Sequence, residues 1–197
     1  TAYSPGRVEI VATYKTFTAN TFLTVKRVCD ANGLMISEIL YDAVGKDDGI
    51  EFIEVYNNNS YECNITGFSL VDGAHSSVAF VFPDDSIISS KGIFVVSQDS
   101  GLFKNAYDVM PDFEGLLFSL NNSGETIIFK DVNETVVDTV YIEGGYKDMT
   151  APASWCYGDE LKSKGGQSAS RTVFNKTYSC YDWDAAVPTP GRITGQK

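Results

Sequence analysis

The sequence is poor in the residues that many enzymes and most nucleic-acid-binding proteins depend on. It contains a single histidine, His75, so a zinc site built from several histidines is excluded and a Ser-His-Asp or Cys-His arrangement would rest on that one ring. Lys and Arg total 15 against 26 Asp and Glu, which gives a net charge of −11. Because proteins bind the phosphate backbone mainly through cations, nucleic acid is not an expected partner. The composition predicts a protein that is not an enzyme.

Long apolar runs are also absent. No stretch approaches the roughly 18 residues that a membrane-spanning helix needs, and the chain begins at Thr1 without a charged-then-apolar leader. We therefore expect no membrane insertion, and a chain that has been processed or trimmed at its N-terminus.

The cysteine and asparagine patterns favour an extracellular or cell-surface location. The four cysteines are even in number and include no C-x-x-C pair, which suits two structural disulfides better than a zinc or redox site. Four buried thiols in a cytosolic domain remain the alternative. Five N-x-S/T sequons occur where chance would give about two, which favours a glycoprotein. The cysteines are Cys29, Cys63, Cys156 and Cys180, and the sequon asparagines are Asn58, Asn64, Asn121, Asn133 and Asn175.

The strand pattern divides the chain into a short N-terminal extension, residues 1–30, and a domain over residues 31–197. The extension holds two β-rich stretches, Arg7 to Thr13 and Thr21 to Val28, joined by a polar segment around Ala19 and Asn20. From residue 34 onward, short apolar strand candidates alternate with Gly, Asn and Asp turns, which is the rhythm of an all-β sandwich.

Nine strand candidates follow the extension, and helix content is expected to be small. They cover residues 34–41, 51–56, 68–71, 77–82, 92–97, 116–120, 126–129, 136–141 and 169–173. One short helix is predicted near residues 100–107, capped by Asp99 or Ser100. In the 51–56 strand, Ile53 and Val55 should face the core while the opposite face should be partly wet.

A hairpin of the first two of these strands favours one disulfide connectivity. If residues 34–41 and 51–56 pair about the turn at 45–49, opposite residues have numbers that sum to about 91. Cys29 and Cys63 sum to 92, which places them together at the open end of the hairpin. Cys156 and Cys180 are then left to pair, and this is the preferred connectivity among the three possible.

The order of several segments resembles the lamin tail domain family, an immunoglobulin-like β-sandwich found in nuclear lamins and in many secreted bacterial and archaeal proteins. The resemblance runs from Leu34 to Gly191 and implies a secreted prokaryotic-type member that acts as a binding or structural module without a catalytic residue. It rests on Met35-Ile-Ser-Glu-Ile-Leu-Tyr41, Glu51-Phe-Ile-Glu-Val-Tyr-Asn57, Ile65 to Asp72, Phe118 to Phe129, Val136 to Tyr141, Ser168-Ala-Ser-Arg171 and Pro188-Thr-Pro-Gly191.

Other candidate sites have a structural interpretation beside the functional one. Acidic residues around the first turn, Asp42, Asp47, Asp48 and Glu51, offer oxygen ligands for Ca²⁺, but their spacing is not that of an EF-hand and a solvated turn is expected instead. No cofactor is therefore predicted.

The sequence favours structural roles for three further features. Asp138 lies in an apolar run and is expected to be a hydrogen-bonded structural acid, and His75 is expected to be a surface residue. The aromatic residues near the C-terminus are expected to cap one end of the sandwich, although an exposed binding platform is the alternative. These are Trp155, Tyr157, Tyr178, Tyr181 and Trp183.

The sequence predicts an extracellular, non-catalytic structural or adhesive protein. An isolated two-stranded hairpin is marginal in water, so the N-terminal strands are expected to pack on their own sandwich, to belong to an upstream domain or to add to the sheet edge of another copy. The last of these would build filaments. Expected partners are other copies of the chain or other surface proteins. The alternatives are an accessory binding domain of a secreted enzyme such as a nuclease, with residues 1–28 left from an upstream domain, and a calcium-dependent ligand-binding module.

Overall fold

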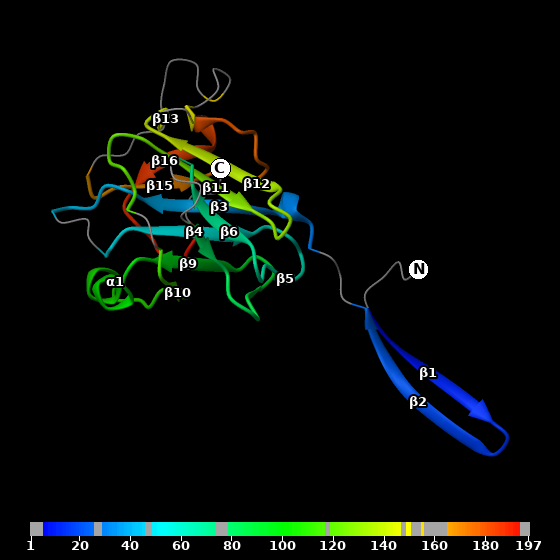
Figure 1. Cartoon of the computed structure of the whole chain (residues 1–197). Helices are drawn as coiled ribbons and strands as arrows, with labels where there is room; N and C mark the ends of the chain where they lie inside the picture. The colour runs from blue at the N-terminus through cyan, green and yellow to red at the C-terminus, as the bar shows by residue number, and fades with distance from the viewer. Residues whose placement is uncertain are drawn as a thin grey trace.

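The structure is a computed structural model that describes residues 6–25, 29–45, 49–73, 79–116, 119–146, 149–150, 155 and 165–193. Two sheets pack face to face, and a hairpin near the N-terminus projects away from them (Figure 1). The hairpin pairs β1 (Gly6–Tyr14) with β2 (Phe17–Val25). This is the all-β, immunoglobulin-like sandwich that the sequence predicts, with its two-stranded extension.

The larger sheet has six strands. Their order is β10 (Phe113–Glu114), β9 (Ile93–Ser97), β4 (Phe52–Asn57), β3 (Leu34–Leu40), β15 (Ser168–Arg171) and β16 (Trp183–Ala186). The four-stranded sheet has the order β12 (Val136–Ile142), β11 (Glu125–Lys130), β6 (Ser69–Asp72) and β7 (Ala79–Val81).

Short elements complete the fold. Two further two-stranded ladders pair β5 (Cys63–Asn64) with β8 (Ile87–Ile88) and β13 (Gly145–Tyr146) with β14 (Met149–Thr150). The helical elements are the 3₁₀ turns η1 (Ala31–Gly33) and η2 (Cys180–Asp182) and the α-helix α1 (Ser100–Tyr107). Among the described residues, no helix is both long and apolar enough to cross a membrane.

The register of β3 and β4 follows the sequence expectation. Leu34 pairs with Asn57, and the numbers of opposite residues sum to 91 until a bulge at Ser37, after which they sum to 92. A bulge inserts one extra residue into one strand, so the sum rises by one. The same register places Cys29 beside Cys63 at the open end of the hairpin, and these two residues form a disulfide.

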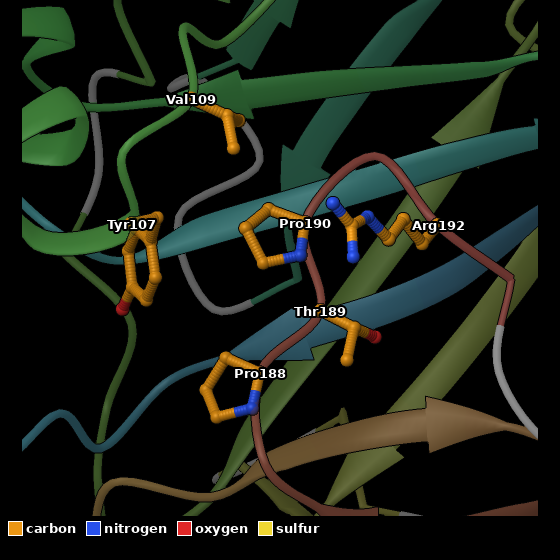
Figure 2. A pocket seen from close by; sticks show the side chains of 6 residues that line it. All are labelled: Tyr107, Val109, Pro188, Thr189, Pro190 and Arg192. Atoms are coloured by element: carbon orange, nitrogen blue, oxygen red, sulfur yellow. The ribbon is translucent and has the colours of Figure 1, made fainter.

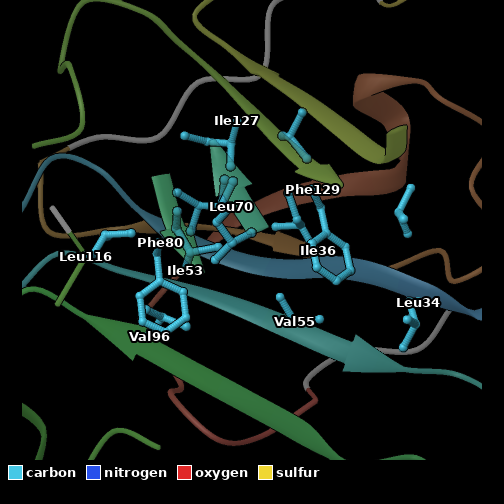
Figure 3. Packing of buried hydrophobic residues seen from close by; sticks show 14 of the residues in the cluster. Leu34, Ile36, Ile53, Val55, Leu70, Phe80, Val96, Leu116, Ile127 and Phe129 are labelled. Carbon is cyan, nitrogen blue, oxygen red and sulfur yellow. The ribbon is translucent and has the colours of Figure 1, made fainter. Parts of the chain in front are cut away.

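Branched and aromatic side chains from both sheets fill the space between them. Ile36, Ile53 and Val55 of the larger sheet meet Leu70 and Phe129 of the smaller one, and all five are completely buried (Figure 3). Burying an aliphatic or aromatic side chain contributes about 1.5–3 kcal/mol relative to leaving it in water, so this layer is the main source of stability.

The outer face of β4 is buried as well, which corrects the prediction of a partly wet face. Phe52, Glu54 and Tyr56 are all buried. Helix α1 covers one end of this face, where Phe103 packs edge-on against Phe52 with ring centroids 5.6 Å apart. The sequence pattern does not reveal this cover because alternation separates two faces of a strand without showing what packs on each.

Two other element predictions differ from the structure. The expected strand at 116–120 is not a strand at its described residues, where the amide of Leu120 donates to the carboxylate of Glu51 at 3.0 Å. The segment at Ala19 and Asn20 lies inside β2, because the hairpin turns at Lys15 and Thr16 instead. Lys15 adopts φ 55°, the left-handed conformation that tight two-residue hairpin turns require.

Candidate functional site

The N-terminal hairpin is the most exposed part of the described chain. Its two nine-residue strands pair without interruption from Gly6 opposite Val25 to Tyr14 opposite Phe17. All described side chains from residue 6 to residue 23 are exposed. In Figure 1 the hairpin extends away from the sandwich, so neither of its faces is covered by the rest of the described chain.

One face of the hairpin is apolar. Directly opposite residues share a face in an antiparallel pair, so Val8 lies with Leu23 and Tyr14 lies with Phe17. Ile10 lies between these pairs on the same face. Tyr14 and Phe17 are 71% and 75% exposed, and the three aliphatic side chains are about half exposed. Contiguous exposed apolar patches are a feature of protein and membrane interaction sites.

The opposite face of the hairpin is more polar, although it also carries Val11 and Phe22, which are 55% and 49% exposed. The amide of Asn20 donates to the Glu9 carboxylate at 2.7 Å, and the Arg7 guanidinium lies 3.6 Å from the centre of the Phe22 ring. These contacts stabilise the hairpin locally and give it two chemically different faces.

The hairpin segment differs in charge from the rest of the chain. Residues 1–28 contain four Lys or Arg and one Glu, a net charge of +3, which leaves −14 for residues 29–197. The extension is therefore electrostatically complementary to the domain that carries it.

A covalent link fixes the base of the extension to the sandwich. Cys29, which follows the hairpin, is bonded to Cys63 of β5. The amide of Asp30 also donates to the Tyr61 hydroxyl at 3.2 Å. Cys180 is disulfide-bonded too, whereas its predicted partner Cys156 lies outside the described residues.

A pair of buried carboxyl groups, of the kind found in some active sites, lies under the C-terminal segment. Glu38 and Glu54 stand opposite each other on β3 and β4, and both are buried. Glu38 accepts hydrogen bonds from Ser168 Oγ at 2.5 Å and from the amide of Thr189 at 2.9 Å. Glu54 accepts one from the amide of Gly191 at 2.5 Å.

Burial raises the pKa of both carboxyl groups, and it raises that of Glu54 well above its usual range because the charge of Glu38 adds to the effect. Paired carboxyl groups with raised pKa values are found in catalytic sites. Here, however, the carboxylates of Glu38 and Glu54 accept hydrogen bonds from Ser168, Thr189 and Gly191 of the same chain. We assign the pair to holding the C-terminal segment on the sheet. Sequence analysis missed it, although the signal was present as two acids in otherwise apolar strands.

A small pocket lies beside this segment. It has a volume of about 180 Å³ and lies where the chain after α1 faces the C-terminal loop (Figure 2). Its lining is Tyr107, Val109, Pro188, Thr189, Pro190 and Arg192. The lining contains no histidine, cysteine or carboxylate, so it offers neither a nucleophile with its base nor a set of metal ligands.

A buried ion pair joins the two sheets. The Arg171 guanidinium of β15 donates to Asp138 of β12 at 2.9 Å and lies 3.5 Å from Asp182. Asp138 also accepts from the amide of Ile36 at 3.0 Å. Burial raises the pKa of Asp138 while Arg171 opposes that shift. Asp138 is thus the structural acid that its place in an apolar strand predicts.

The calcium candidates do not form a described site. Asp42 accepts from the Asn122 side chain at 3.1 Å, and Glu51 is buried and holds the amide of Leu120. Asp47 and Asp48 lie outside the described residues. Within the described part of the chain, no group of three or more His, Cys, Asp or Glu could hold a metal ion.

The sequon asparagines differ in exposure. Asn64, Asn133 and Asn175 are exposed, while Asn58 and Asn121 are half-buried. The Asn58 side-chain amide, the group that a glycan would modify, donates to the carbonyl of Phe174 at 2.9 Å. Of the five predicted sites, the three exposed asparagines are therefore the more accessible to a modifying enzyme.

The C-terminal aromatic residues split between the two predicted roles. Trp155 and Trp183 are buried, the first against Tyr141 and the second under Arg171, as a cap requires. Tyr178 and Tyr181 are more than half exposed. Tyr157 and His75 lie outside the described residues.

Comparison with known proteins identifies the domain. The family model of the lamin tail domain matches residues 29–144, more than half of the chain. Lamin tail domains are non-catalytic, immunoglobulin-like domains. No match was found among curated proteins or among solved structures. The match begins at the disulfide that follows the hairpin and covers the first strands of both sheets, and the chain therefore belongs to the lamin tail domain family.

Proposed function

We propose that the chain is an extracellular, non-catalytic structural or adhesive subunit that associates with other copies of itself through its N-terminal hairpin. The observation that carries this proposal is the apolar hairpin face, which lies in water in the single chain. Lamin-tail membership supports the absence of catalysis, and the buried carboxyl groups described above have structural partners.

The size of the apolar face supports association between proteins. The exposed parts of Tyr14, Phe17, Val8, Ile10 and Leu23 amount to about 600 Å², and a specific interface buries about 800 Å² on each partner. The backbone edges of the hairpin add hydrogen bonds when a strand is added to a sheet. The face is therefore large enough to form most of one side of an interface.

A second copy is the partner that the charges favour. The extension carries +3 and the remaining chain −14, so the hairpin of one molecule is attracted to the sandwich of another. In such a contact the hairpin of one molecule binds a different surface, the sandwich, of the next. Each added molecule leaves a free hairpin and a free sandwich surface, so the assembly grows into a filament.

The Cys29–Cys63 disulfide and the exposed sequons support an extracellular setting. The disulfide also suits a filament subunit. A force that pulls on the hairpin is carried through the disulfide to β5, so less of it acts on β3, the strand that follows Cys29.

The experiment compares assembly of the full chain with that of two double variants, using electron microscopy and light scattering over a concentration series. Ile10→Ser with Phe17→Ser changes the apolar face, and Thr13→Ser with Asn20→Ser is the matched change on the polar face. We expect the first variant to lose filaments and the second to retain them. A full chain that stays monomeric at high concentration would overturn the proposal.

A further inference from the structure

We infer that the acceptor for the hairpin is the outer edge of β16 on a second copy, so that the six-stranded sheet of one molecule continues into the hairpin of the next. This inference rests on the proposed function and names the surface that function uses. The two sheets of the sandwich present four edges to an incoming strand, at β10, β16, β12 and β7.

The edge of β12 is blocked by the protein itself. The carbonyl of Val137 accepts a hydrogen bond from Lys176 Nζ at 2.8 Å, and the amide of Thr139 donates to the Asp138 carboxylate at 3.0 Å. Backbone groups that are already bonded to side chains are not available to an incoming strand. Natural β-sandwiches protect long edge strands in this way, because the free backbone groups of an exposed edge can pair with a strand of another chain.

The edges of β10 and β7 are the shortest of the four. β10 has two residues and pairs with β9 in the parallel direction. β7 has three residues, and Pro83 follows it closely without a backbone donor. β16 is also short, with four residues, but it is the longest of these three edges, and no proline interrupts it.

Part of the β16 edge is open among the described residues, and the pairing with β15 shows which backbone groups face outward. The carbonyl of Asp182 accepts from the amide of Thr172 at 2.7 Å, so its backbone faces inward, toward the β15 side. Inward and outward groups alternate along an antiparallel strand, so the backbone groups of Trp183 and Ala185 point away from β15. The amide of Trp183 donates to the carbonyl of Cys180 at the end of η2. Among the described residues, no partner is found for the backbone groups of Ala185.

The side chains at this edge match the apolar hairpin face. Ala185 lies on the same face of β16 as Trp183, which belongs to the core, yet Ala185 itself is exposed. Val187 follows the strand and is 75% exposed. A hairpin paired with β16 can extend the apolar face of the sheet over these two side chains and bury part of both surfaces.

The acceptor lies on another molecule because of where the hairpin leaves the sandwich. Cys29 is fixed to β5, and three residues separate it from Val25, so the Cα atoms of Val25 and Cys29 are at most about 15 Å apart. In Figure 1 the hairpin leaves beside β5 and points outward, whereas β16 lies toward the other side of the sandwich. Pairing between copies then runs head to tail.

The test replaces one outward-facing amide on each of two edges in the full chain. Ala185→Pro removes the outward donor of β16, and Val81→Pro is the matched control because Val81 is exposed and faces outward on β7. Proline is tolerated at outward positions of edge strands, so both variants should fold. Ala185→Lys is a second variant that places a charge on the β16 edge without changing the backbone.

We expect Ala185→Pro and Ala185→Lys to raise the concentration needed for assembly at least tenfold, with Val81→Pro within twofold of the unchanged chain. Normal assembly of both Ala185 variants, or loss of assembly in Val81→Pro alone, would overturn the β16 assignment while the proposed function stands. If the double change on the apolar hairpin face also leaves assembly intact, the proposed function fails and this inference fails with it.

Discussion

Two hairpins of this chain, β1–β2 and β3–β4, have a similar residue pattern but differ in burial. In the β3–β4 hairpin, both faces are buried, and Ile53 is completely inaccessible. In the β1–β2 hairpin every described side chain is exposed, and Ile10 is 50% exposed. Both have branched and aromatic residues in strand-like alternation. The difference teaches that alternation specifies a strand and its faces, while burial depends on what the rest of the molecule brings to them.

The two regions also handle their polar groups differently. The sandwich joins its sheets through the buried Arg171–Asp138 pair and blocks the edge of β12 with Lys176 and Asp138. The hairpin carries only exposed polar contacts, such as Asn20 with Glu9, and leaves both of its edges open. The polar groups of the sandwich ion pair are buried and paired, whereas those of the hairpin are exposed.

Matched phenylalanine truncations test this contrast most strongly. Phe129→Ala removes a fully buried ring from the core and should lower the free energy of unfolding by about 3–5 kcal/mol. Phe17→Ala removes a ring that is 75% exposed and should change it by less than about 0.5 kcal/mol. Urea denaturation of the non-assembled chain measures both. Equal losses in the two variants would show that the hairpin packs on the sandwich in solution.

Removing a charge from the buried ion pair should have the next largest effect. Asp138→Asn removes the negative charge that Arg171 pairs with and leaves the buried guanidinium charge without its main partner. The free energy of unfolding should fall by about 3 kcal/mol, because an unpaired buried charge is strongly unfavourable. Asn20→Ala removes the exposed hairpin contact and serves as the control, with no measurable change. Thermal denaturation at neutral pH compares the two. A stability loss in Asn20→Ala similar to that in Asp138→Asn would contradict the contrast.

Removing the disulfide that joins the hairpin segment to the sandwich should lower the free energy of unfolding slightly less than the Asp138 change. The Cys29–Cys63 disulfide closes a loop with a sequence separation of 34, and cross-links of this kind contribute about 2–4 kcal/mol, mainly by restricting the unfolded chain. Cys29→Ser with Cys63→Ser should lower the free energy of unfolding by about that amount. Chemical denaturation without reductant measures it, and an unchanged denaturation midpoint would show that the link adds nothing to stability.

The smallest expected effect is a change in pH dependence. Burial raises the pKa of Glu125 to about 7, and nearby Asp72 adds to the shift. The folded state therefore favours the protonated form, and the stability that this provides below pH 4.5 is lost as pH rises toward 7. Glu125→Gln should flatten this decline and stabilise the protein by about 2 kcal/mol at pH 8.

Glu9→Gln on the exposed hairpin is the control for this measurement and should leave the pH profile of stability unchanged. Denaturation between pH 4 and pH 8 provides the comparison. A Glu125→Gln profile that keeps the slope of the unchanged protein would show that other buried acids, such as Glu38 and Glu54, account for the pH dependence.

Much of the local structure could be predicted from the sequence because it depends on neighbouring residues. The predicted helix matches α1 residue for residue, since Asp99 caps it by accepting from the amide of Leu102. The β3–β4 register and the Cys29–Cys63 pairing follow from turn position and strand length. The turn of the N-terminal hairpin was misplaced, because Lys15 and Thr16 lack the Gly or Asn that marks most tight turns.

The sequence by itself determined the β-sandwich class, the faces of its strands and the charge contrast between the extension and the domain, since these depend on residue type and order. Which strand faces are covered, and which sheet edges stay open, depends on the packing of distant segments. This packing buried Glu38 and Glu54 under a segment some 140 residues away in the chain, and it left the hairpin face in water. Burial and edge protection depend on contacts between distant residues, and local sequence does not encode such contacts.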